Sequence, residues 1–365
     1  MISTLQQFVV AESPSLEKAP SDQCCTIIAE EWAKRGVQVE RISVKHRGDQ
    51  LRFTYWPHSS RPDGQLFILG HYDTVYATGS LAKMPFRVSG GKVFGPGTFD
   101  MKAGIVQGLF ALDAIQQNAA ALRKRLVFLW TSDEEIGSEA SRKVIEEEAR
   151  RSDAVFVLEP SFGPKGLLKT SRKGVGEAEL IVHGRSSHAG LAPQEGVNAI
   201  HELAKQIERI QPWNDPKRGV SVNVCITEGG TRTNVIPEQA RALFDLRALR
   251  ASDMHSLERR LYSLKPVLRG AKLEVKGGFS RAPLEEKVTK GLYTKAKALA
   301  TKMGLSLGDC TVGGGSDGNI TGALGIPTLD GLGAVGDGAH SSHEHVIAKT
   351  MPERAALLAA LLTTI

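Results

Sequence analysis

The sequence predicts an α/β fold, an open sheet flanked by helices, with a second and smaller domain inserted into it. Up to about residue 160, short apolar segments of strand length alternate with segments of helical spacing. Several of these strands end in acidic or histidine residues, as expected where a sheet edge carries an active site. From about residue 173 the pattern changes to strand–helix–strand–strand–helix–strand, the order of a ferredoxin-like unit.

The elements of the first part follow from periodicity and from helix-ending residues. Helical spacing covers residues 4–35 and stops at Gly36, a favourable C-terminal cap. The pattern then predicts a hairpin over 37–55, strands over 65–69, 125–131 and 154–158, and helices over 102–117 and 140–150.

The insertion has its own set of elements. We expect strands over 175–183, 220–227, 239–246 and 272–275, with helices over 197–210 and 253–264. A helix over 284–303, a glycine-rich loop over 313–338 and a last helix from Pro352 complete the chain. The prediction is therefore one domain made of residues 1–172 and 281–365, interrupted by an inserted domain over 173–280.

Composition excludes several classes of protein. No stretch reaches the roughly 18–20 uncharged apolar residues of a membrane helix, so no membrane contact is expected. The net charge is +6, but basic residues are scattered among acidic ones, so nucleic acid is not an expected partner. Residues 1–14 lack the basic segment of a signal peptide, and the four cysteines show no C-x-x-C spacing. We therefore expect a cytoplasmic protein.

Acidic and imidazole groups recur where predicted strands or loops meet the sheet edge. They are His71, Asp100, the pair Glu134 and Glu135, Glu159, and His340. An isolated histidine at a strand end is more often a structural polar group than a ligand. Imidazoles and carboxylates at several consecutive strand ends instead indicate a mixed nitrogen and oxygen site for zinc or a similar divalent ion.

Five motifs resemble those of the dizinc metallopeptidases and aminoacylases that carry an inserted dimerisation domain. The motifs are GHYDTV at 70–75, GPGTFDMKAG at 95–104, DEEIGS at 133–138, SSHAG at 186–190 and HSSHE at 340–344. That family includes glutamate carboxypeptidases, acetylornithine deacetylase and succinyl-diaminopimelate desuccinylase. The resemblance covers nearly the whole chain. It implies a zinc-exopeptidase-like mixed sheet flanked by helices, with a ferredoxin-like dimerisation (lid) domain.

The resemblance also implies a ligand set for two Zn²⁺ ions, with Co²⁺ or Mn²⁺ as alternatives. Asp100 would bridge both ions. His71 and Glu159 would complete the shell of one ion, and Glu135 and His340 that of the other. A bridging carboxylate holds two cations close enough to act on one carbonyl group.

Two further carboxylates match residues that serve the reaction. Glu134 matches the general base, which takes a proton from the attacking water and returns it to the leaving nitrogen. Asp73 matches the carboxylate that accepts the other N–H of the His71 imidazole. In the C-terminal motif His343 is an alternative to His340 as the ligand.

The remaining matches lie in the insertion and in the glycine-rich loop. His188 matches a histidine that stabilises the oxyanion, in the family from the partner subunit of a homodimer formed through the inserted domain. Asn234 and Arg247 match residues that contact the carboxylate of the substrate. Gly315 belongs to a turn whose backbone approaches the substrate.

The implied activity is metal-dependent hydrolysis of an amide bond next to a free carboxylate. We expect a metallo-exopeptidase like the glutamate carboxypeptidases, acting on small peptides or N-acyl amino acids. A biosynthetic deacylase of the acetylornithine or succinyl-diaminopimelate type is the alternative, and an inactive relative that only binds a ligand or a partner chain is an alternative of another class. One departure concerns the substrate, because Leu167 stands where glutamate carboxypeptidases have a lysine, with Lys165 and Lys169 on either side.

Overall fold

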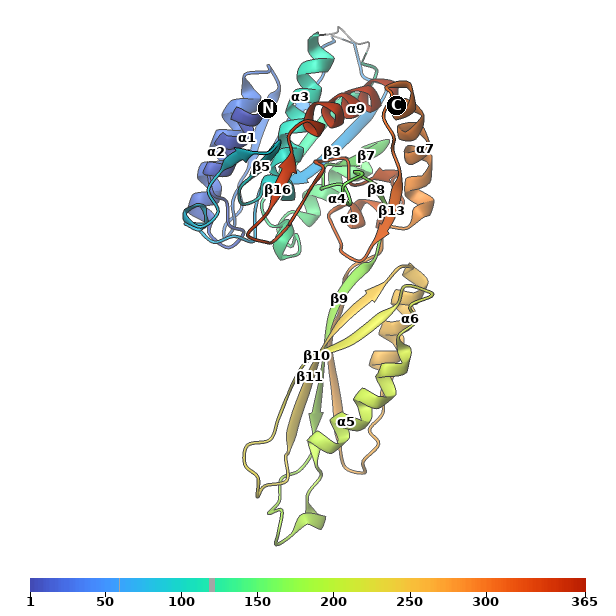
Figure 1. The fold of residues 1–365 in the computed structure, drawn as a ribbon. Helices are drawn as coiled ribbons and strands as arrows, with labels where there is room; N and C mark the ends of the chain where they lie inside the picture. Colours follow the sequence, from blue (N-terminus) through green and yellow to red (C-terminus); the bar gives the residue numbers. More distant parts are fainter. Residues whose placement is uncertain (59, 118–121) are drawn as a thin grey trace. The chain divides into compact units, whose positions relative to one another are not determined.

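The computed structural model describes residues 1–58, 60–117 and 122–365, which form two compact units (Figure 1). The first unit consists of Met1–Ser171, Glu285–Thr311 and Ser316–Ile365. The second consists of Arg172–Leu284 and Val312–Gly315. It runs four residues past the predicted end of the insertion at 280 and also includes a short return of the chain at 312–315. Within the described ranges, every helix is too short or too polar to span a bilayer.

A mixed six-stranded sheet forms the centre of the first unit. Its order is β1-β2-β6-β3-β7-β14, and its strands are β1 (Gln38–Ile42), β2 (Gln50–Tyr55), β3 (Gln65–His71), β6 (Arg125–Thr131), β7 (Ala154–Val157) and β14 (Thr328–Leu329). Strands β6, β3, β7 and β14 run parallel, whereas the hairpin β1-β2 joins β6 antiparallel. The predicted hairpin and the predicted α/β sheet are both confirmed.

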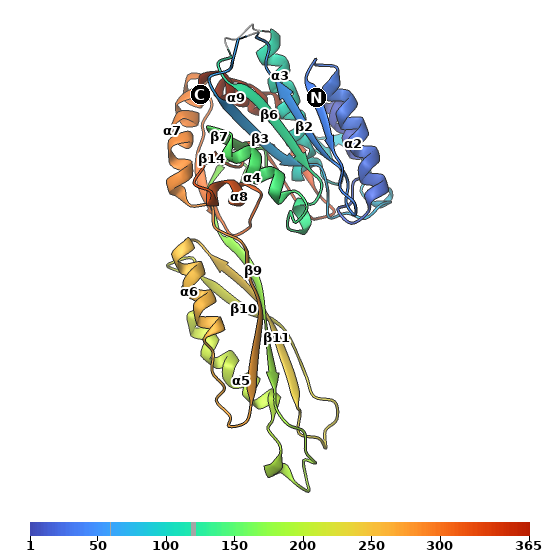
Figure 2. The same ribbon diagram turned by 180° about the vertical axis from the view of Figure 1, so that it is seen from behind.

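Helices cover both faces of this sheet because its central strands are apolar on both sides. Along β3, Leu66 and Ile68 pack on one face, and Phe67 and Leu69 pack on the other, all fully buried. The first face is covered by α2 (Lys18–Ala33), α3 (Ala103–Gln117), α7 (Glu286–Lys302) and α9 (Thr350–Thr364), and the second by α4 (Arg142–Arg150) and α8 (Gly318–Ala323). Figure 1 shows α3 and α9 in front of the sheet, and Figure 2, from behind, shows α4 and α8 in front of it. Burying each such side chain contributes about 1.5–3 kcal/mol to the stability of the fold. This burial stabilises the strands whose ends carry the acidic and imidazole side chains.

Short strands that the sequence pattern missed tie the C-terminal loop to the rest of the first unit. A four-stranded sheet has the order β15-β16-β5-β4, with β4 (Arg87–Ser89), β5 (Lys92–Phe94), β15 (Gly336–Asp337) and β16 (His345–Ile347). A further pair joins β8 (Leu168–Arg172) and β13 (Asp309–Val312). Strands of two or three residues show no alternation that could reveal them. The antiparallel pairing of β16 with β5 places the HSSHE motif beside the GPGTFD motif.

The predicted single helix over residues 4–35 is wrong. The structure has two helices there, α1 (Ile2–Val10) and α2, separated by a short extended segment. Pro14 lacks an N–H and disfavours helical dihedral angles at the residue before it. The backbone of Ser13 and Ser15 instead bonds to Thr74, with Thr74 N–H donating to Ser13 O at 2.9 Å and Ser15 N–H donating to Thr74 O at 3.1 Å.

The second unit is a ferredoxin-like α+β sandwich. Its elements in chain order are β9 (Gly174–His183), α5 (Ala199–Ile210), β10 (Ser221–Gly229), β11 (Gln239–Ala248), α6 (Ala251–Tyr262) and β12 (Lys272–Arg281). The sheet order is β10-β11-β9-β12, and every pairing is antiparallel. Leu203 of α5 and Leu257 of α6 pack with Leu180 and Phe244 of the sheet. The predicted strand–helix order is confirmed, although β12 continues beyond the expected end at 275.

Candidate metal centre

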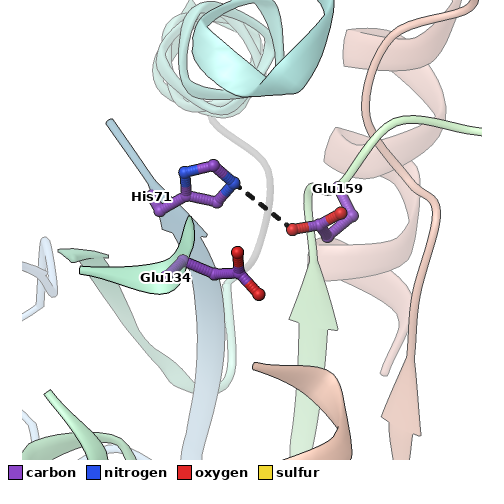
Figure 3. Close-up of side chains that lie close together, drawn as sticks. All are labelled: His71, Glu134 and Glu159. Atoms are coloured by element: carbon purple, nitrogen blue, oxygen red, sulfur yellow. Dashed lines mark ion pairs between the residues drawn. The ribbon is translucent and has the colours of Figure 1, made fainter. Parts of the chain in front are cut away.

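Three parallel strands bring their carboxyl ends to one edge of the main sheet. His71 is the last residue of β3. Glu134 begins a short turn, η3 (Glu134–Ile136), three residues after β6, and Glu159 stands two residues after β7. Atoms of these three side chains that could bind a metal ion or a proton lie within 4.8 Å of one another. Figure 3 shows the three side chains facing one another across the strand ends.

His71 is buried between two carboxylates. Its Nε2 atom lies 3.3 Å from Asp100 Oδ1 and 3.4 Å from Glu159 Oε1. Among the described residues, neither His71 Nε2 nor Asp100 Oδ1 makes a hydrogen bond of good geometry, although both atoms are fully buried. Buried polar atoms without such partners are rare and indicate a ligand or ion.

Asp100 lies between two imidazoles and presents one oxygen to each. Its Oδ1 atom faces His71, and its Oδ2 atom lies 3.5 Å from Nε2 of His340. His340 also lies 3.1 Å from Oε2 of Glu135, and His71, Asp100 and Glu135 form a second group of ligand atoms within 4.8 Å. The peptide bond from Asp100 to Met101 is cis. This arrangement suits a carboxylate that bridges two cations.

Backbone N–H groups, held by Glu344, set the position of Asp100. The buried carboxylate of Glu344 accepts N–H groups from Gly97 at 2.9 Å, Phe99 at 2.8 Å and Asp100 at 2.9 Å. Burial raises the pKa of Glu344 to about 7. Since Glu344 lies four residues after His340, one loop supplies both a candidate ligand and the support of another.

Asp73 lies behind His71 and connects it to the Glu134 turn. Asp73 Oδ1 lies 3.3 Å from His71 Nδ1, and the carbonyl oxygen of Asp73 lies 3.0 Å from the same nitrogen. The carboxylate also accepts the N–H of Glu134 at 3.2 Å and of Glu135 at 3.3 Å. Asp73 therefore orients the imidazole and the two adjacent glutamates together.

The pKa of His71 reflects the negative charge of the carboxylates around it. Burial lowers the pKa of His71, but the carboxylates of Asp100, Asp73 and Glu159 outweigh burial and hold its pKa well above the usual value. A cation at this position would be stabilised by the same carboxylates that favour the imidazolium form.

The other imidazole behaves in the same way. Contacts with Asp100 and Glu135 raise the pKa of His340 to about 10, and burial raises the pKa of Glu135. Two imidazoles and several carboxylates thus fit divalent cations in a mixed nitrogen and oxygen site, where the cations replace the protons.

His343, the alternative to His340, lies apart from these contacts. Its Nδ1 atom lies 2.9 Å from Ser341 Oγ. Its imidazole lines a cavity of about 770 Å³ in the first unit, which Asp100 and Lys169 also line. Lys165 is exposed and is not part of the cavity lining.

His188 belongs to the second unit and is exposed. Its Nδ1 atom accepts the N–H groups of Gly190 and Leu191, both at 3.1 Å. A neutral ring that accepts at Nδ1 carries its proton on Nε2, which makes it a hydrogen-bond donor there. The neighbouring Ala189 N–H donates to the carbonyl oxygen of Asn234 at 2.9 Å, so His188 and Asn234 lie on adjacent segments.

Arg247 and Gly315 also belong to the second unit. Asp245 holds the guanidinium of Arg247 at 2.8 Å, and Nη1 of Arg247 lies 3.4 Å from Gly313 O. Gly315 O accepts from Arg172 Nη1 at 3.1 Å. The return of the chain at 312–315 therefore contacts two arginines of the second unit. The roles of His188, Asn234, Arg247 and Gly315 toward a substrate stay predictions.

Comparisons with known proteins show the family of this chain. The sequence model of peptidase family M20/M25/M40 matches residues 67–364 of this chain. The chain belongs to this family. It is a metal-dependent hydrolase, and the predicted family resemblance is confirmed.

Relatives of this M20 chain include peptidases and a deacylase. Carboxypeptidase G2 from Pseudomonas sp. (strain RS-16) is 34% identical over 303 residues, which cover 81% of this chain and 73% of the relative. Succinyl-diaminopimelate desuccinylase from Ectopseudomonas mendocina (strain ymp) is 27% identical over 94% of this chain and 93% of the relative. The fold resembles the crystal structure of aminopeptidase PepT from Bacillus cereus ATCC 10987, with a TM-score of 0.83, 22% identity and coverage of 99% and 97%.

Metal binding is expected to release protons at neutral pH. At pH 7 the metal-free His340 is protonated, since contacts with Asp100 and Glu135 raise its pKa to about 10, and a ligand imidazole must be neutral. His71 contributes in the same direction, so about two protons should leave when the site fills at pH 7. Calorimetric titration with Zn²⁺ in two buffers of different ionisation enthalpy counts them. His340→Gln should release about one proton fewer. A heat of binding that does not depend on the buffer would contradict this account.

Proposed function

We propose that this M20 enzyme hydrolyses an amide bond next to a free carboxylate, in small peptides or N-acyl amino acids. The observation that carries the proposal is the position of Asp100, with one carboxylate oxygen toward His71 and the other toward His340. Two ligand groups that share one carboxylate are suited to holding two cations on either side of it.

Zinc is the metal we propose for both positions, with Co²⁺ or Mn²⁺ as replacements. His71 and Glu159 with Asp100 would hold one ion, and Glu135 and His340 with Asp100 the other. When bound, such ions polarise the scissile carbonyl and lower the pKa of the attacking water.

Glu134 is the proposed general base. Its neighbour Glu135 faces His340, whereas Glu134 lies near His71 and Glu159 at the strand ends. The Asp73 carboxylate accepts the N–H of Glu134 at 3.2 Å and so holds the turn that carries it. Glu134 takes a proton from the attacking water and delivers it to the leaving nitrogen.

His188 is the proposed stabiliser of the oxyanion, supplied by the partner subunit of a homodimer. The two backbone N–H groups at its Nδ1 support this role because they leave the Nε2–H as the donor. A neutral imidazole that donates from Nε2 can bind a developing negative charge without a change of tautomer. Asn234 and Arg247 would bind the substrate carboxylate, with Asp245 orienting the guanidinium.

The substrate class follows from the relatives and from the cavity. Identity is higher to carboxypeptidase G2, at 34%, than to the desuccinylase, at 27%, which favours an exopeptidase. The desuccinylase matches a larger share of this chain, so a biosynthetic deacylase stays the second candidate. Lys169 lines the same cavity as Asp100, and its ammonium group can bind the carboxylate of either an acidic peptide or an acidic acyl group.

Replacement of Glu134 tests the mechanism. Glu134→Ala should lower kcat by about 10²–10⁴-fold while two metal ions per chain remain bound, because a general base contributes that much and the ligands are intact. Metal content by elemental analysis and steady-state rates are the measurements. Glu139→Ala, which removes an exposed carboxylate nearby, is the control and should keep the wild-type rate. A chelator should silence the wild type and Zn²⁺ restore it. An unchanged rate in Glu134→Ala would remove the mechanism, and a metal-loaded wild type without any turnover would favour the inactive relative.

A substrate panel separates the two enzyme candidates. Folyl- and aminoacyl-glutamates represent the carboxypeptidase, and N-acetyl- and N-succinyl-diamino acids represent the deacylase. We expect the glutamates to give the higher kcat/KM by at least about tenfold, a difference of about 1.4 kcal/mol in transition-state stabilisation. A preference of similar size for the diamino acids would transfer the assignment to the deacylase.

The assembly is tested by mass and by complementation. Light scattering should give twice the chain mass of 39.3 kDa. His188→Ala should lower kcat by about 10²–10³-fold, as loss of an oxyanion donor does. Mixing inactive His188→Ala with inactive Glu134→Ala chains should restore part of the activity, because a mixed dimer contains one site with both residues. A fully active monomer would rule out the role of a partner subunit.

A further inference from the structure

The segment between α1 and α2 runs alongside the chain that follows His71. Pro14 and Thr74 form a parallel bridge, with backbone hydrogen bonds at 2.9 Å and 3.1 Å on either side of it. The M20 match begins at residue 67, so this N-terminal segment lies outside it.

The hydroxyl group of Ser15 reaches the carboxylate of Asp73. Ser15 Oγ donates to Asp73 Oδ2 at 2.7 Å, with a longer contact of 3.1 Å to Thr74 O. Ser15 is 4% exposed and Asp73 is fully buried, so water does not compete for this contact. It is shorter than the contacts of the same carboxylate with Glu134 N, at 3.2 Å, and Glu135 N, at 3.3 Å.

Asp73 connects Ser15 to the candidate metal centre, because its carboxylate contacts both Ser15 and residues of that centre. Its Oδ2 atom accepts from both Ser15 and Glu135, while Oδ1 accepts from Glu134 and faces His71 Nδ1 at 3.3 Å. Among the residues that the structure describes, loss of the Ser15 donor leaves Asp73 Oδ2 with the longer contact to Glu135 N. A buried carboxylate that loses a donor shifts toward its remaining partners, which here orient the His71 ring and the Glu134 turn.

Other contacts hold the N-terminal segment independently of the Ser15 hydroxyl. Ser13 Oγ donates to Tyr72 O at 2.6 Å, and Ser21 Oγ donates to Pro14 O at 2.8 Å. The buried ammonium of Lys102 donates to Ala11 O at 3.1 Å. Removing the hydroxyl of Ser15 therefore removes its contacts with Asp73 Oδ2 and Thr74 O and leaves the path of the segment in place.

We propose that Ser15 is a positioning residue of the metal centre, which acts through Asp73 on His71 and on the turn of Glu134 and Glu135. The proposal rests on the proposed function in that it takes His71 and Glu135 as metal ligands. The metal-binding readouts need no substrate, so they test Ser15 even if the chain hydrolyses none of the panel.

Ser15→Ala and Ser13→Ala form a matched pair. Each removes one buried hydroxyl from the same segment, but only Ser15 contacts the Asp73 carboxylate. Co²⁺ is titrated into each metal-free protein against a chelating dye, and the visible absorption spectrum of the Co²⁺ form is recorded. Ser15→Ala should bind Co²⁺ about tenfold more weakly, with a changed spectrum, as loss of a partner of a ligand typically does. Ser13→Ala should stay within about twofold of the wild type, with an unchanged spectrum.

Rates at saturating metal complete the test. In Ser15→Ala kcat should fall about tenfold while KM stays within about twofold, because Ser15 does not touch the substrate. Equal effects of the two variants on Co²⁺ affinity and spectrum would mean a structural role only and would overturn the proposal, as would wild-type behaviour of Ser15→Ala. If Ser15→Ala does not fold, Ser15→Cys carries the test, since a thiol is a weak donor. It should weaken Co²⁺ binding severalfold, and wild-type affinity in that variant would overturn the proposal.

Discussion

Negative charge concentrated at one edge of the main sheet is the constraint on which the rest of the first unit depends. Asp100, Glu135 and Glu159 lie within 3.1–3.5 Å of the two imidazoles of His71 and His340. Carboxylates gathered around the same two imidazoles repel one another unless a cation or a proton lies between them. The carboxylates raise the pKa values of His71 and His340 because they stabilise positive charge between them. In the proposed enzyme, metal ions supply this positive charge.

Backbone N–H groups hold these side chains in place through two buried carboxylates that are not themselves proposed ligands. Glu344 gathers three N–H groups around Asp100, and Asp73 gathers those of Glu134 and Glu135 while facing His71. Glu344 is distant in the sequence from Asp100, and Asp73 is distant from Glu134 and Glu135. The loop of His340 and Glu344 reaches Asp100 because β16 pairs with β5.

The main sheet explains why His71, Glu134 and Glu159 meet. Their strands β3, β6 and β7 are neighbours and run parallel, so residues at their carboxyl ends share one edge. The strands are apolar on both faces because helices cover both, and this burial fixes the register that places the three ends together. Charged residues can cluster at this edge because the apolar layers beneath it supply the stability.

Much of the fold could be predicted from the sequence because its signals are local. The apolar strands, the amphipathic helices and the strand–helix order of the second unit each show within a short window, and the structure has them. The prediction of one helix over 4–35 was wrong because Pro14 interrupts the helix, although the residues on both sides of it have helical spacing. The short strands β4, β5, β15 and β16 were missed because they exist only through pairing with each other.

By itself the sequence determined which residue types stand at the strand ends, and so the mixed imidazole and carboxylate chemistry of the centre and its family. Only the tertiary structure decided which other residues hold them: that Glu344 accepts the N–H groups around Asp100, that His343 lies beside Ser341, and that Ser15 reaches Asp73. The physical reason is separation along the chain. Ser15 and Asp73 are 58 residues apart and His340 and Glu135 are 205 apart, and no local pattern records contacts that form only when sheets and loops close on one another.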